Sequence, residues 1–554
     1  MKKKILIVGG VAGGASAAAR LRRLDEHADI ILFERDGYIS FANCGLPYYI
    51  GETIQERSKL MVQTPEGMKA RFNLDIRTHS EVIRVDPERK RVEVRSTDKG
   101  IYEESYDFLI LSPGAKPMKP PIPGMESGLI YTLRNIPDTD RIKAHVDQQN
   151  VKSAIVVGGG FIGVEMAENL RQRGLEVALV EAAPHVLAPF DTEMVAFAEK
   201  ELEDHGVLLY LGDGVKEFRE HDQGIEVLLD SGTALSADMV ILAIGVTPDT
   251  GFLKDSGIGL GPRGHIQVNG HMQTNKEGVY AVGDAVEVND YVNSNVTAIP
   301  LAGPANKQGR IAADHICGLE SAYKGTQGTA IIKIFGLTGA STGNNERALQ
   351  RLGIPYHVLY VHPNSHAAYY PGAAPIAIKL LFNGQGKLLG AQAFGSEGVD
   401  KRMDVISTVQ RLGGTVYDLA ELELSYAPPF SSAKDPVNMA GYLAGNILDG
   451  LAEVVTYKDV DQRTEGEQIV LDVRTKAEYD KGHIEGAVHI PVDELRSRMH
   501  ELDKDQEIYA YCAVGVRGHV ASRILTQHGY RVKNVTGGYR TYAMSQYAAG
   551  QRGR

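Results

Sequence analysis

The residue best suited to redox chemistry in this sequence is Cys44, which has no second cysteine nearby. It lies in the stretch Ser40-Phe41-Ala42-Asn43-Cys44-Gly45-Leu46-Pro47-Tyr48-Tyr49. A redox dithiol with C-x-x-x-x-C spacing would carry its second cysteine at position 49, where this chain has a tyrosine. If Cys44 does redox chemistry, its partner must therefore be brought in, as a small thiol, a persulfide sulfur or a peroxide oxygen.

A second candidate nucleophile, Cys512, begins a short loop after an apolar run. The run over 508–511 predicts a buried strand, and the loop Cys512-Ala513-Val514-Gly515-Val516-Arg517-Gly518 leads into a predicted helix. Loop N–H groups and the helix N-terminus favour a thiolate, and the same concavity can hold an anionic persulfide. Arg517 would add positive charge. The third cysteine, Cys317, falls in a predicted helix over 311–319 and is interpreted as a small buried apolar residue.

The element that must position Cys44 is a nucleotide-binding unit directly before it. Residues 5–8 predict a buried strand, 9–14 a glycine turn, the following residues a helix to about 24, and 30–33 a second strand that ends at Glu34. Backbone N–H groups at such a turn bind a pyrophosphate, and the acid accepts from a ribose hydroxyl. The match is imperfect, because Val11 occupies the middle glycine position of G-x-G-x-x-G.

A second unit of the same kind begins at residue 154. Its turn Gly158-Gly159-Gly160-Phe161-Ile162-Gly163 is a complete G-x-G-x-x-G between a predicted strand and a predicted helix, and its second strand ends at Glu181. An acid at that position accepts from a free ribose 2′-hydroxyl and repels a 2′-phosphate, which favours NADH without excluding NADPH. Two such units in one chain indicate an enzyme that binds two dinucleotides.

Composition narrows the class of protein. The chain has 554 residues, which suggests three or four domains, and a net charge of −11, which argues against nucleic acid as a partner. We expect no signal peptide, no membrane span and no metal site. The three cysteines are far apart in the sequence, which fits a reducing cytoplasm rather than a disulfide framework.

These motifs, in this order, resemble the FAD/NAD(P) pyridine nucleotide-disulfide reductase family. The pattern T-x6-A-x-G-D at Thr274, Ala281, Gly283 and Asp284 completes the resemblance, and a carboxylate there can accept hydrogen bonds from a ribityl chain. The segment 40–44 is similar to the single-cysteine branch of this family, most closely to the coenzyme A disulfide reductases. The resemblance covers roughly residues 1–447.

The resemblance implies an α/β chain with two Rossmann-like domains, for FAD and for NAD(P), followed by an α+β dimerisation domain. The expected boundaries are 1–150 and 247–327 for the two parts of the FAD domain, 151–246 for the NAD(P) domain, 328–447 for the dimerisation domain and 448–457 for a linker. Within this frame, residues 81–111 predict a β-rich insertion, and 336–343 and 376–382 predict strands of the dimerisation sheet.

The resemblance also assigns binding residues to each ligand. For FAD they are Gly9, Gly10, Ala12, Gly13, Gly14, Glu34, Arg35, Ser112, Gly114, Gly283, Asp284 and Ala302. For NAD they are Gly158, Gly160, Phe161, Ile162, Gly163, Glu181 and Gly245. For coenzyme A they are Arg20, Arg23, Ser40, Asn43, Lys69, Arg71, Asn306 and Lys434. Of the arginines on the first helix, Arg20, Arg22 and Arg23, we expect at least one to be a solvated residue without a binding role.

Tyrosines of the dimerisation domain are expected to complete the site. In coenzyme A disulfide reductases, tyrosines in segments like 369–372 and 425–430 reach the cysteine of the partner subunit. This assigns a catalytic role to Tyr426 and to either Tyr369 or Tyr370, and implies a homodimer whose active sites are completed across the interface. The alternative is that these aromatic residues are only interface core.

Residues 458–554 resemble a rhodanese domain over their whole length. The run Ile469-Val470-Leu471-Asp472-Val473-Arg474 predicts a strand, and residues 482–491 read Gly-His-Ile-Glu-Gly-Ala-Val-His-Ile-Pro. The loop from Cys512 to Arg517 has the short length of sulfurtransferases rather than the longer one of related phosphatases. An inactive rhodanese-like module usually lacks the cysteine, so we expect an active α/β domain that handles persulfide sulfur.

The favoured hypothesis is an NAD(P)H:coenzyme A disulfide reductase that forms a mixed disulfide at Cys44. Reduction of a coenzyme A persulfide or a polysulfide, with release of sulfide, is a second use of the same site that the sequence does not rank firmly. The sequence also leaves open which molecule donates the sulfur and whether Cys512 exchanges sulfur directly with Cys44.

Two other classes of function are weaker. An NADH oxidase or peroxidase would cycle Cys44 through a sulfenic acid, but relatives of that kind place a histidine in the first glycine turn, where this chain has Ala12. A non-enzymatic redox sensor or sulfur-carrier scaffold would have no need for Cys512 together with two cofactor units.

Overall fold

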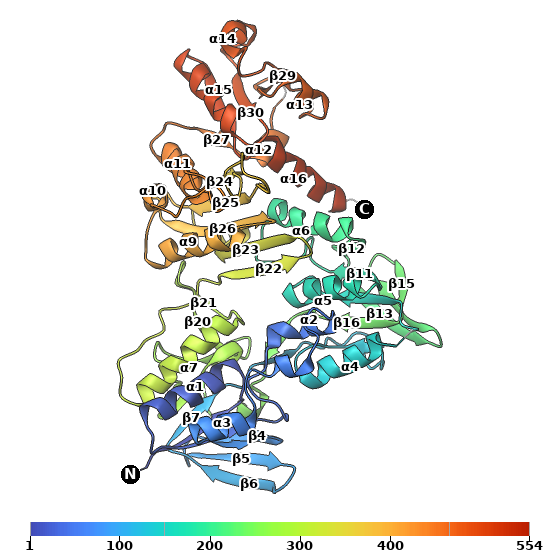
Figure 1. Ribbon diagram of the computed structural model, residues 1–554, viewed down its shortest axis with the longest axis vertical. Helices are drawn as coiled ribbons and strands as arrows, with labels where there is room; N and C mark the ends of the chain where they lie inside the picture. The colour runs from blue at the N-terminus through green and yellow to red at the C-terminus, as the bar shows by residue number, and fades with distance from the viewer. Residues whose placement is uncertain (1, 149, 465, 553–554) are drawn as a thin grey trace. The chain divides into compact units, whose positions relative to one another are not determined.

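The computed structural model describes residues 2–148, 150–464 and 466–552 and divides into two compact units (Figure 1). The first unit holds residues 1–182 and 213–328, and the second holds residues 183–212 and 329–554. Among the described residues, no helix is long and apolar enough to cross a membrane.

The first unit is built on a parallel sheet in the order β19-β7-β1-β2-β3. Its strands are β1 (Lys4–Val8), β2 (Asp29–Phe33), β3 (Asp75–Arg77), β7 (Phe108–Leu111) and β19 (Val279–Ala281). Strand β1 lies at the centre of this sheet, and its residues Ile5, Leu6 and Ile7 are fully buried. Helix α1 (Ala12–Leu24) packs against α7 (Ala302–Ile316) on this sheet (Figure 1). The predicted strands at 5–8 and 30–33 are confirmed.

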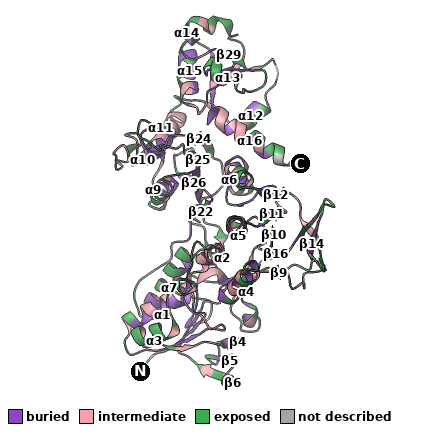
Figure 2. Cartoon of the chain, turned by 45° about the vertical axis from the view of Figure 1, so that its right-hand side comes forward, coloured by how far each residue is buried: buried purple, intermediate pink, exposed green. Residues whose placement is uncertain are grey.

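Strand β19 joins this sheet from far along the chain, which brings Gly283 and Asp284 to the same edge as the first glycine turn. The predicted β-rich insertion is an antiparallel sheet of β4 (Ser80–Asp86), β5 (Arg91–Ser96) and β6 (Gly100–Ser105). Strand β6 is its outer strand, and much of it is exposed (Figure 2).

A second parallel sheet carries the second glycine turn. Its strands in the first unit are β9 (Ile130–Tyr131), β10 (Ser153–Val157), β11 (Glu176–Glu181) and β16 (Met239–Leu242), with β10 between β11 and β16. Helix α5 (Phe161–Gln172) follows the turn, as predicted. An antiparallel sheet of β13 (Val215–His221), β14 (Gly224–Leu229) and β15 (Ala234–Ala237) precedes β16.

The second unit contains an antiparallel sheet in the order β22-β23-β26-β25-β24. Its strands are β22 (Ala330–Ile334), β23 (Leu337–Gly343), β24 (His357–Val361), β25 (Ala377–Phe382) and β26 (Leu388–Gly395), so the strands predicted at 336–343 and 376–382 are confirmed. Strands β25 and β26 are buried along their whole length. The helices of this region are α6 (Thr192–Asp204), α8 (Glu346–Arg351), α9 (Val399–Arg411), α10 (Val416–Glu421) and α11 (Pro436–Leu448).

The last part of the second unit is a parallel sheet in the order β27-β31-β30-β28-β29. Its strands are β27 (Val454–Val455), β28 (Gln468–Asp472), β29 (Val488–His489), β30 (Glu507–Tyr511) and β31 (Arg531–Val535). Its main helices are α12 (Tyr457–Asp461), α13 (Lys476–Asp480), α15 (Val516–Gln527) and α16 (Gly538–Arg552). The linker expected over 448–457 is shorter in the structure, because Val454 and Val455 pair with β31 and belong to this sheet.

Cys317 differs slightly from its expected setting. Helix α7 ends at Ile316, and Cys317 is the residue that terminates it. Its side chain is partly buried against the apolar core of the first sheet, which agrees with the interpretation of a small apolar residue.

Candidate functional site

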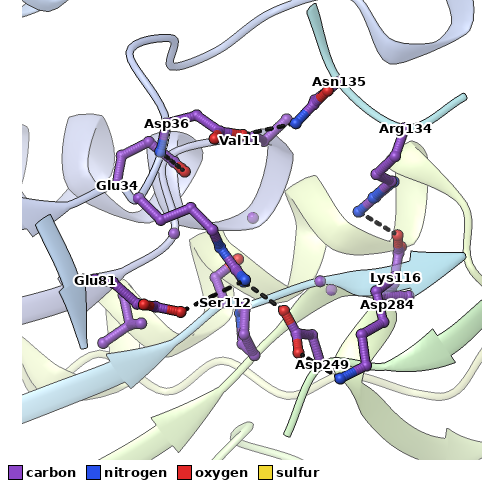
Figure 3. Close-up of a pocket in the computed structure, with 18 of the residues that line it drawn as sticks. Val11, Glu34, Asp36, Glu81, Ser112, Lys116, Arg134, Asn135, Asp249 and Asp284 are labelled. Atoms are coloured by element: carbon purple, nitrogen blue, oxygen red, sulfur yellow. Dashed lines mark hydrogen bonds and ion pairs between the residues drawn. The ribbon is translucent and has the colours of Figure 1, made fainter. Parts of the chain in front are cut away.

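A cavity of about 620 Å³ opens in the first unit where the first glycine turn meets the ends of β2, β7 and β19 (Figure 3). Nine of the residues predicted to bind FAD line it, and they come from segments far apart in the chain. They are Gly9, Ala12, Gly13, Glu34, Arg35, Ser112, Gly114, Gly283 and Asp284. The sheet thus gathers most of the predicted site around one space large enough for part of a dinucleotide.

The remaining predicted FAD residues do not line this cavity. Gly10 and Gly14 pack inside the turn: a Cβ at Gly14 would lie 1.9 Å from the carbonyl oxygen of Gly9, so their small size permits close helix-to-strand packing. Ala302 is exposed at the start of α7, and Ala305, one turn later, takes its place in the lining. The binding role predicted for Ala302 stays a prediction.

The first turn has free hydrogen-bond donors for an anionic group. Gly9 has φ +93°, and a Cβ there would lie 2.1 Å from the carbonyl oxygen of Ser112, so this position accepts only glycine. No described side chain caps the N-terminus of α1, which leaves its first N–H groups available to a pyrophosphate. These features fit a bound dinucleotide.

Glu34 is fixed before any ligand binds. Its Oε2 accepts a hydrogen bond from the Gly10 N–H at 2.9 Å, and its Oε1 accepts from the Asp36 N–H at 3.2 Å. Burial raises the pKa of this carboxyl above its ordinary value, and the two N–H groups act in the opposite direction. Glu34 can therefore accept from a ribose hydroxyl in a position set by the backbone of the turn.

Sequence reasoning missed several charged residues of this cavity. Arg134 lies 3.6 Å from a carboxylate oxygen of Asp284 (Figure 3). Burial raises the pKa of Asp284, and Arg134 opposes that shift. Arg35 pairs with Asp249, and Lys116 lies 3.3 Å from the same carboxylate. Arg134, Asp249 and Lys116 belong to no recognisable motif, so only the folded chain shows that they meet here.

Cys44 lies exposed in a short 3-10 turn (Asn43–Gly45) that leads into α2 (Leu46–Ile50). Helix α2 packs against α5, and the Tyr48 hydroxyl donates to Glu165 Oε1 at 3.4 Å. Burial raises the pKa of Glu165 to about 7. Partial desolvation, and then the charges of Glu165 and Asp284, raise the pKa of the Cys44 thiol. The described chain by itself therefore disfavours a Cys44 thiolate.

A second cavity, of about 380 Å³, lies beside the loop that carries Cys44. Five predicted coenzyme A residues line it: Arg20, Arg23, Ser40, Arg71 and Asn306. Ser16, Gln63 and Arg310 also line it and were not predicted. Ser40 lies in the wall of this cavity and is four residues from Cys44 in the chain, so one loop carries both the cavity wall and the sulfur.

Two predicted coenzyme A residues lie elsewhere in the first unit. Asn43 lines the larger cavity, and Lys69 is exposed on α3 (Pro65–Phe72) outside the lining of the basic one. Arg22 is the structural member of the first-helix arginines, because it is 6% exposed and donates to the backbone carbonyls of Phe72 and Asn73. Arg20 forms a 2.7 Å ion pair with Asp314, and Arg310 lies 3.9 Å from the same carboxylate. Arg23 and Arg71, and to a lesser degree Arg310, therefore supply most of the positive charge.

The second glycine turn is built like the first. Gly158 has φ +109°, and a Cβ there would lie 2.4 Å from the carbonyl oxygen of Ala243. The Gly159 N–H donates to Glu181 Oε2 at 2.6 Å, so the acid at the end of β11 is held against the turn. Gly160 and Gly245 have open space on their Cα atoms, and Phe161, Ile162 and Gly163 form the first turn of α5. This arrangement fits a nicotinamide dinucleotide.

In the second unit, the predicted tyrosines separate into a pair and a single residue. The hydroxyls of Tyr369 and Tyr426 are 3.2 Å apart, and the two side chains are 76% and 51% exposed. The ring of Tyr370 instead lies edge-on to His366. The hydrogen bond between Tyr369 and Tyr426 raises the pKa of Tyr369. Lys434 is exposed ahead of α11.

The loop after β30 forms a cradle around Cys512. Cys512 is 1% exposed, and its sulfur accepts a hydrogen bond from the Gly515 N–H at 3.1 Å. The carbonyl oxygens of Cys512 and Ala513 accept from the N–H groups of Tyr539 and Arg540, at the start of α16. Backbone N–H groups at the start of α16, and that of Gly515 directly before α15, thus fix the shape of the loop.

This cradle is also tied to the antiparallel sheet of the same unit. The Thr536 hydroxyl accepts from the Tyr360 N–H at 2.8 Å, and a Cβ at Gly537 would lie 2.7 Å from Cβ of Tyr360. The Thr541 hydroxyl lies 2.8 Å from His362 Nε2. The segment 536–541, which also bonds the Cys512 loop, is therefore docked on β24.

Beneath this contact lies a fully buried lysine. Lys379 Nζ is 2.8 Å from Asp191, 2.5 Å from Glu193 and 2.5 Å from Glu346. Burial alone would lower the pKa of Lys379, but these carboxylates hold it well above its ordinary value. The hydroxyls of Tyr360 and Tyr457 donate to Glu193 at 2.8 and 3.0 Å. The ammonium thus provides the cation that the three acids surround, and α12 contributes to the same network.

Three family models match the chain. The model of the pyridine nucleotide-disulphide oxidoreductases matches residues 3–309, that of their dimerisation domain matches residues 329–436, and that of the rhodanese-like domain matches residues 456–545.

Individual proteins match over most of the chain. A coenzyme A disulfide reductase of Staphylococcus epidermidis is 38% identical over 445 residues, which are 80% of this chain and 99% of that protein. The crystal structure of reduced CoADR-RHD from Bacillus anthracis is 53% identical with a TM-score of 0.97, and the match covers 100% of this chain and 99% of that one. An NAD-dependent persulfide reductase from A. fulgidus is 35% identical with a TM-score of 0.91, over 97% of this chain and 100% of that one.

Proposed function

The chain belongs to the pyridine nucleotide-disulphide oxidoreductase family, and on that premise we propose that it is a flavin-dependent NAD(P)H:coenzyme A disulfide reductase. We further propose that its rhodanese-like domain handles persulfide sulfur at Cys512. The similarity to coenzyme A disulfide reductases over residues of both nucleotide domains and the dimerisation domain supports the first proposal.

The observation that carries the proposal is the basic cavity beside the Cys44 loop. Arg23, Arg71 and Arg310 present guanidinium groups there in a chain whose net charge is −11. Coenzyme A has its phosphates at one end and its thiol at the other, joined by a flexible arm. Guanidinium groups bind phosphates in a bidentate fashion, so this cavity would select the carrier while Cys44 reacts with its sulfur.

The chemistry proposed at Cys44 is thiol–disulfide exchange. The Cys44 thiolate attacks one sulfur of a coenzyme A disulfide, forms a mixed disulfide and releases one coenzyme A thiolate. Uptake of two electrons by the mixed disulfide then returns the Cys44 thiolate and a second coenzyme A. FAD, when bound in the larger cavity, supplies the transfer of those electrons from a nicotinamide. A nearby acid that protonates the departing thiolate speeds the exchange.

We assign that acid to the pair Tyr369 and Tyr426. Their hydroxyls share a hydrogen bond and are exposed, as expected of side chains that act on a second copy of the chain. The matched dimerisation domain supports a homodimer, and the proposal is that each active site is completed by the partner subunit. Tyr370 is left out because its ring is engaged with His366.

For the electron donor, we propose NADH in preference to NADPH. The carboxylate of Glu181 is held by the Gly159 N–H at the end of β11. A ribose 2′-hydroxyl can donate to it, whereas a 2′-phosphate would be repelled. Because Cys44, Cys317 and Cys512 are all free thiols, we also keep the reducing cytoplasm as the proposed location.

Reduction of a coenzyme A persulfide is the second candidate, and the Cys512 cradle favours it. A domain that holds a persulfide in the same chain as Cys44 would supply or consume the sulfur of such a substrate. The match to a persulfide reductase over nearly the whole chain supports this candidate. An oxidase is less well supported, because Ala12 in the cavity wall offers no acid or base to a peroxide.

The test is peptide mass spectrometry of the protein purified without reductant. We expect a coenzyme A adduct on Cys44 that is lost when NADH is added. Cys44 found as a free thiol or sulfenic acid, with no adduct even after incubation with coenzyme A disulfide, would overturn the proposal and favour the oxidase. A flavin spectrum with negligible NADH turnover on every disulfide and persulfide would favour the hypothesis of a non-enzymatic redox sensor.

The phosphate-binding role has its own test. Arg310→Ala should raise the KM for coenzyme A disulfide about tenfold, as expected for the loss of a charge-assisted hydrogen bond. The KM for pantethine, which lacks those phosphates, should not change. Lys69→Ala is the matched control, because Lys69 is an exposed cation outside the cavity. An equal effect of Arg310→Ala on both substrates would contradict the assignment.

A further inference from the structure

The arginine of the Cys512 loop is not free to meet an anionic substrate. Arg517 forms a two-point ion pair with Glu478, with Nη1 to Oε2 at 2.8 Å and Nη2 to Oε1 at 2.6 Å. Glu478, and also the charge of Cys512, raise the pKa of Arg517. Arg517 thus lies near both the sulfur and a carboxylate, and both of its Nη atoms donate to Glu478.

Glu478 is held in place independently of Arg517. It is the third residue of α13, and its Oε2 accepts from the N–H and the hydroxyl of Thr475 at 3.0 and 2.8 Å. These bonds form a capping box at the start of the helix. The pairing with Arg517, and then the Thr475 bonds, hold the pKa of Glu478 at about 2. The carboxylate is therefore present and charged at any physiological pH.

Other cations near the ends of these strands are also engaged. Arg474 forms a two-point ion pair with Asp472 and donates to the Gly482 carbonyl. The guanidinium of Arg540 lies over the ring of Phe197 on α6. Position 513 of the loop is alanine. Negative charge on the sulfur is thus stabilised by the Gly515 N–H, directly before the first residue of α15.

We infer that Glu478 is a specificity-determining residue of the rhodanese-like domain, which selects sulfane sulfur on a hydropersulfide over thiosulfate and similar dianions. A dianion needs an unbalanced cation at the mouth of the loop, and the fixed carboxylate both balances Arg517 and repels the second charge. The terminal sulfur of a hydropersulfide carries at most one negative charge, which the backbone cradle accommodates. This inference rests on the sulfur-transfer role proposed for Cys512.

The transfer step balances without an added oxidant or reductant. The Cys512 thiolate attacks the terminal sulfur of R–S–SH, the S–S bond of the donor breaks, and R–S⁻ leaves with the electron pair of that bond. Cys512 becomes Cys–S–SH, and the proton stays on the transferred sulfur or passes to the departing thiolate. With thiosulfate the same attack would release sulfite, whose double charge departs past Glu478.

The experiment measures persulfidation of Cys512 in the full-length holoenzyme by quenched-flow peptide mass spectrometry, with cysteine persulfide and with thiosulfate as the two probes. The wild-type chain should react with cysteine persulfide much faster than with thiosulfate. Glu478→Gln keeps the acceptor for Thr475 but removes the charge, and should raise the thiosulfate rate about tenfold while changing the persulfide rate less than about twofold. Glu478→Asp should restore the selectivity.

A merely structural role for Glu478 would not produce this pattern. In Glu478→Gln the thiosulfate rate should fall with added salt, because a freed Arg517 attracts the dianion, whereas the persulfide rate should not. Equal rates with both probes in the wild type, or an equal change of both rates in Glu478→Gln, would overturn the inference.

A second variant covers the case in which Glu478→Gln does not fold. Ala513→Arg adds a cation to the loop without touching Glu478, and should also raise the thiosulfate rate. No gain in that variant would overturn the inference. Because neither NADH nor coenzyme A enters the assay, failure here is distinct from failure at Cys44. A wild-type Cys512 that takes sulfur from neither probe would sink both this inference and the sulfur-transfer proposal.

Discussion

Cys44 and Cys512 are both candidate nucleophiles, yet the chain surrounds them in opposite ways. Cys44 is exposed, yet partial desolvation, and then the carboxylates of Glu165 and Asp284, raise the pKa of its thiol. Cys512 is buried and accepts from the Gly515 N–H, and the arginine beside it is paired with Glu478. Under the proposed function, Cys44 lies in a site that a cofactor, a substrate and a second subunit complete, whereas Cys512 lies in a site formed by its own loop.

The difference follows from the kind of structure that carries each sulfur. The Cys44 turn leads into a helix of five residues whose neighbours belong to the nucleotide domains, so its electrostatics depend on what those domains bind. The Cys512 loop is fixed by hydrogen bonds from α16 and precedes a helix of 12 residues. We therefore expect changes in one site to leave the other almost untouched.

The largest expected effect comes from exchanging each sulfur for oxygen. Cys44→Ser should lower the rate of coenzyme A disulfide reduction at least about a thousandfold, because the nucleophile is lost. The same variant should persulfidate Cys512 at the wild-type rate. Cys512→Ser should show the reverse pattern, measured by NADH oxidation and by peptide mass spectrometry. Loss of both activities in either variant would break the comparison.

The next largest effect concerns the buried lysine network that contacts the rhodanese-like domain. Lys379→Met leaves the buried carboxylates of Asp191, Glu193 and Glu346 without their cation, and should lower the free energy of unfolding by about 3–5 kcal/mol. Thermal unfolding of the second unit would report it. Lys458→Met is the matched control, because Lys458 is 46% exposed and lies 3.4 Å from Glu346. It should cost about 0.5 kcal/mol. Equal losses would contradict a special role for the buried lysine.

A pH experiment sharpens the contrast at Cys44. The pKa of Glu165 is about 7, so its carboxyl is neutral well below that pH and charged above it. The charge opposes a Cys44 thiolate, so Glu165→Gln should speed alkylation of Cys44 roughly three- to tenfold above pH 8. Below pH 6 the variant and the wild type should react alike. Cys512 alkylation serves as the internal control, and a pH-independent difference at Cys44 would count against this explanation.

The smallest expected effect tests the docking of the Cys512 loop. Thr536→Val removes the hydroxyl that accepts from the Tyr360 N–H, and should cost about 1 kcal/mol of stability. It should also slow Cys512 alkylation a few-fold without changing Cys44. Thr526→Val, at an exposed position near the end of α15, is the control. An unchanged Cys512 rate in Thr536→Val would show that β24 does not help to position the loop.

Sequence reasoning predicted the parts of the fold that depend on local patterns. Buried strands and glycine turns at 5–14 and 154–163 leave a signal in consecutive residues, because steric limits at positions such as Gly9 admit one residue type. The predicted relationship and fold class were confirmed by the family matches. The assigned roles of individual site residues stay predictions.

The sequence could not reveal contacts between side chains that are far apart along the chain. Arg134, Arg310 and Glu478 belong to no motif that sequence reasoning used, and each acquires its role from a partner brought close by the fold. The network around Lys379 is the clearest case, since its acids come from α6, from the residue before it and from α8, while the lysine lies on β25. Asn43 was predicted to bind coenzyme A and lines the larger cavity instead of the basic one. A loop residue can face either side, and spacing does not decide which.

The docking of segment 536–541 on β24 bears on how freely this chain could exchange its domains during evolution. Tyr457 and Lys458 of the rhodanese-like domain both bind acids that also surround Lys379. A descendant that lost this domain would have to replace those donors or the acids themselves. The fused domain is therefore hard to lose in a single step. In related chains, the residues on α6, α8 and β24 should differ according to whether the rhodanese-like domain is present or absent.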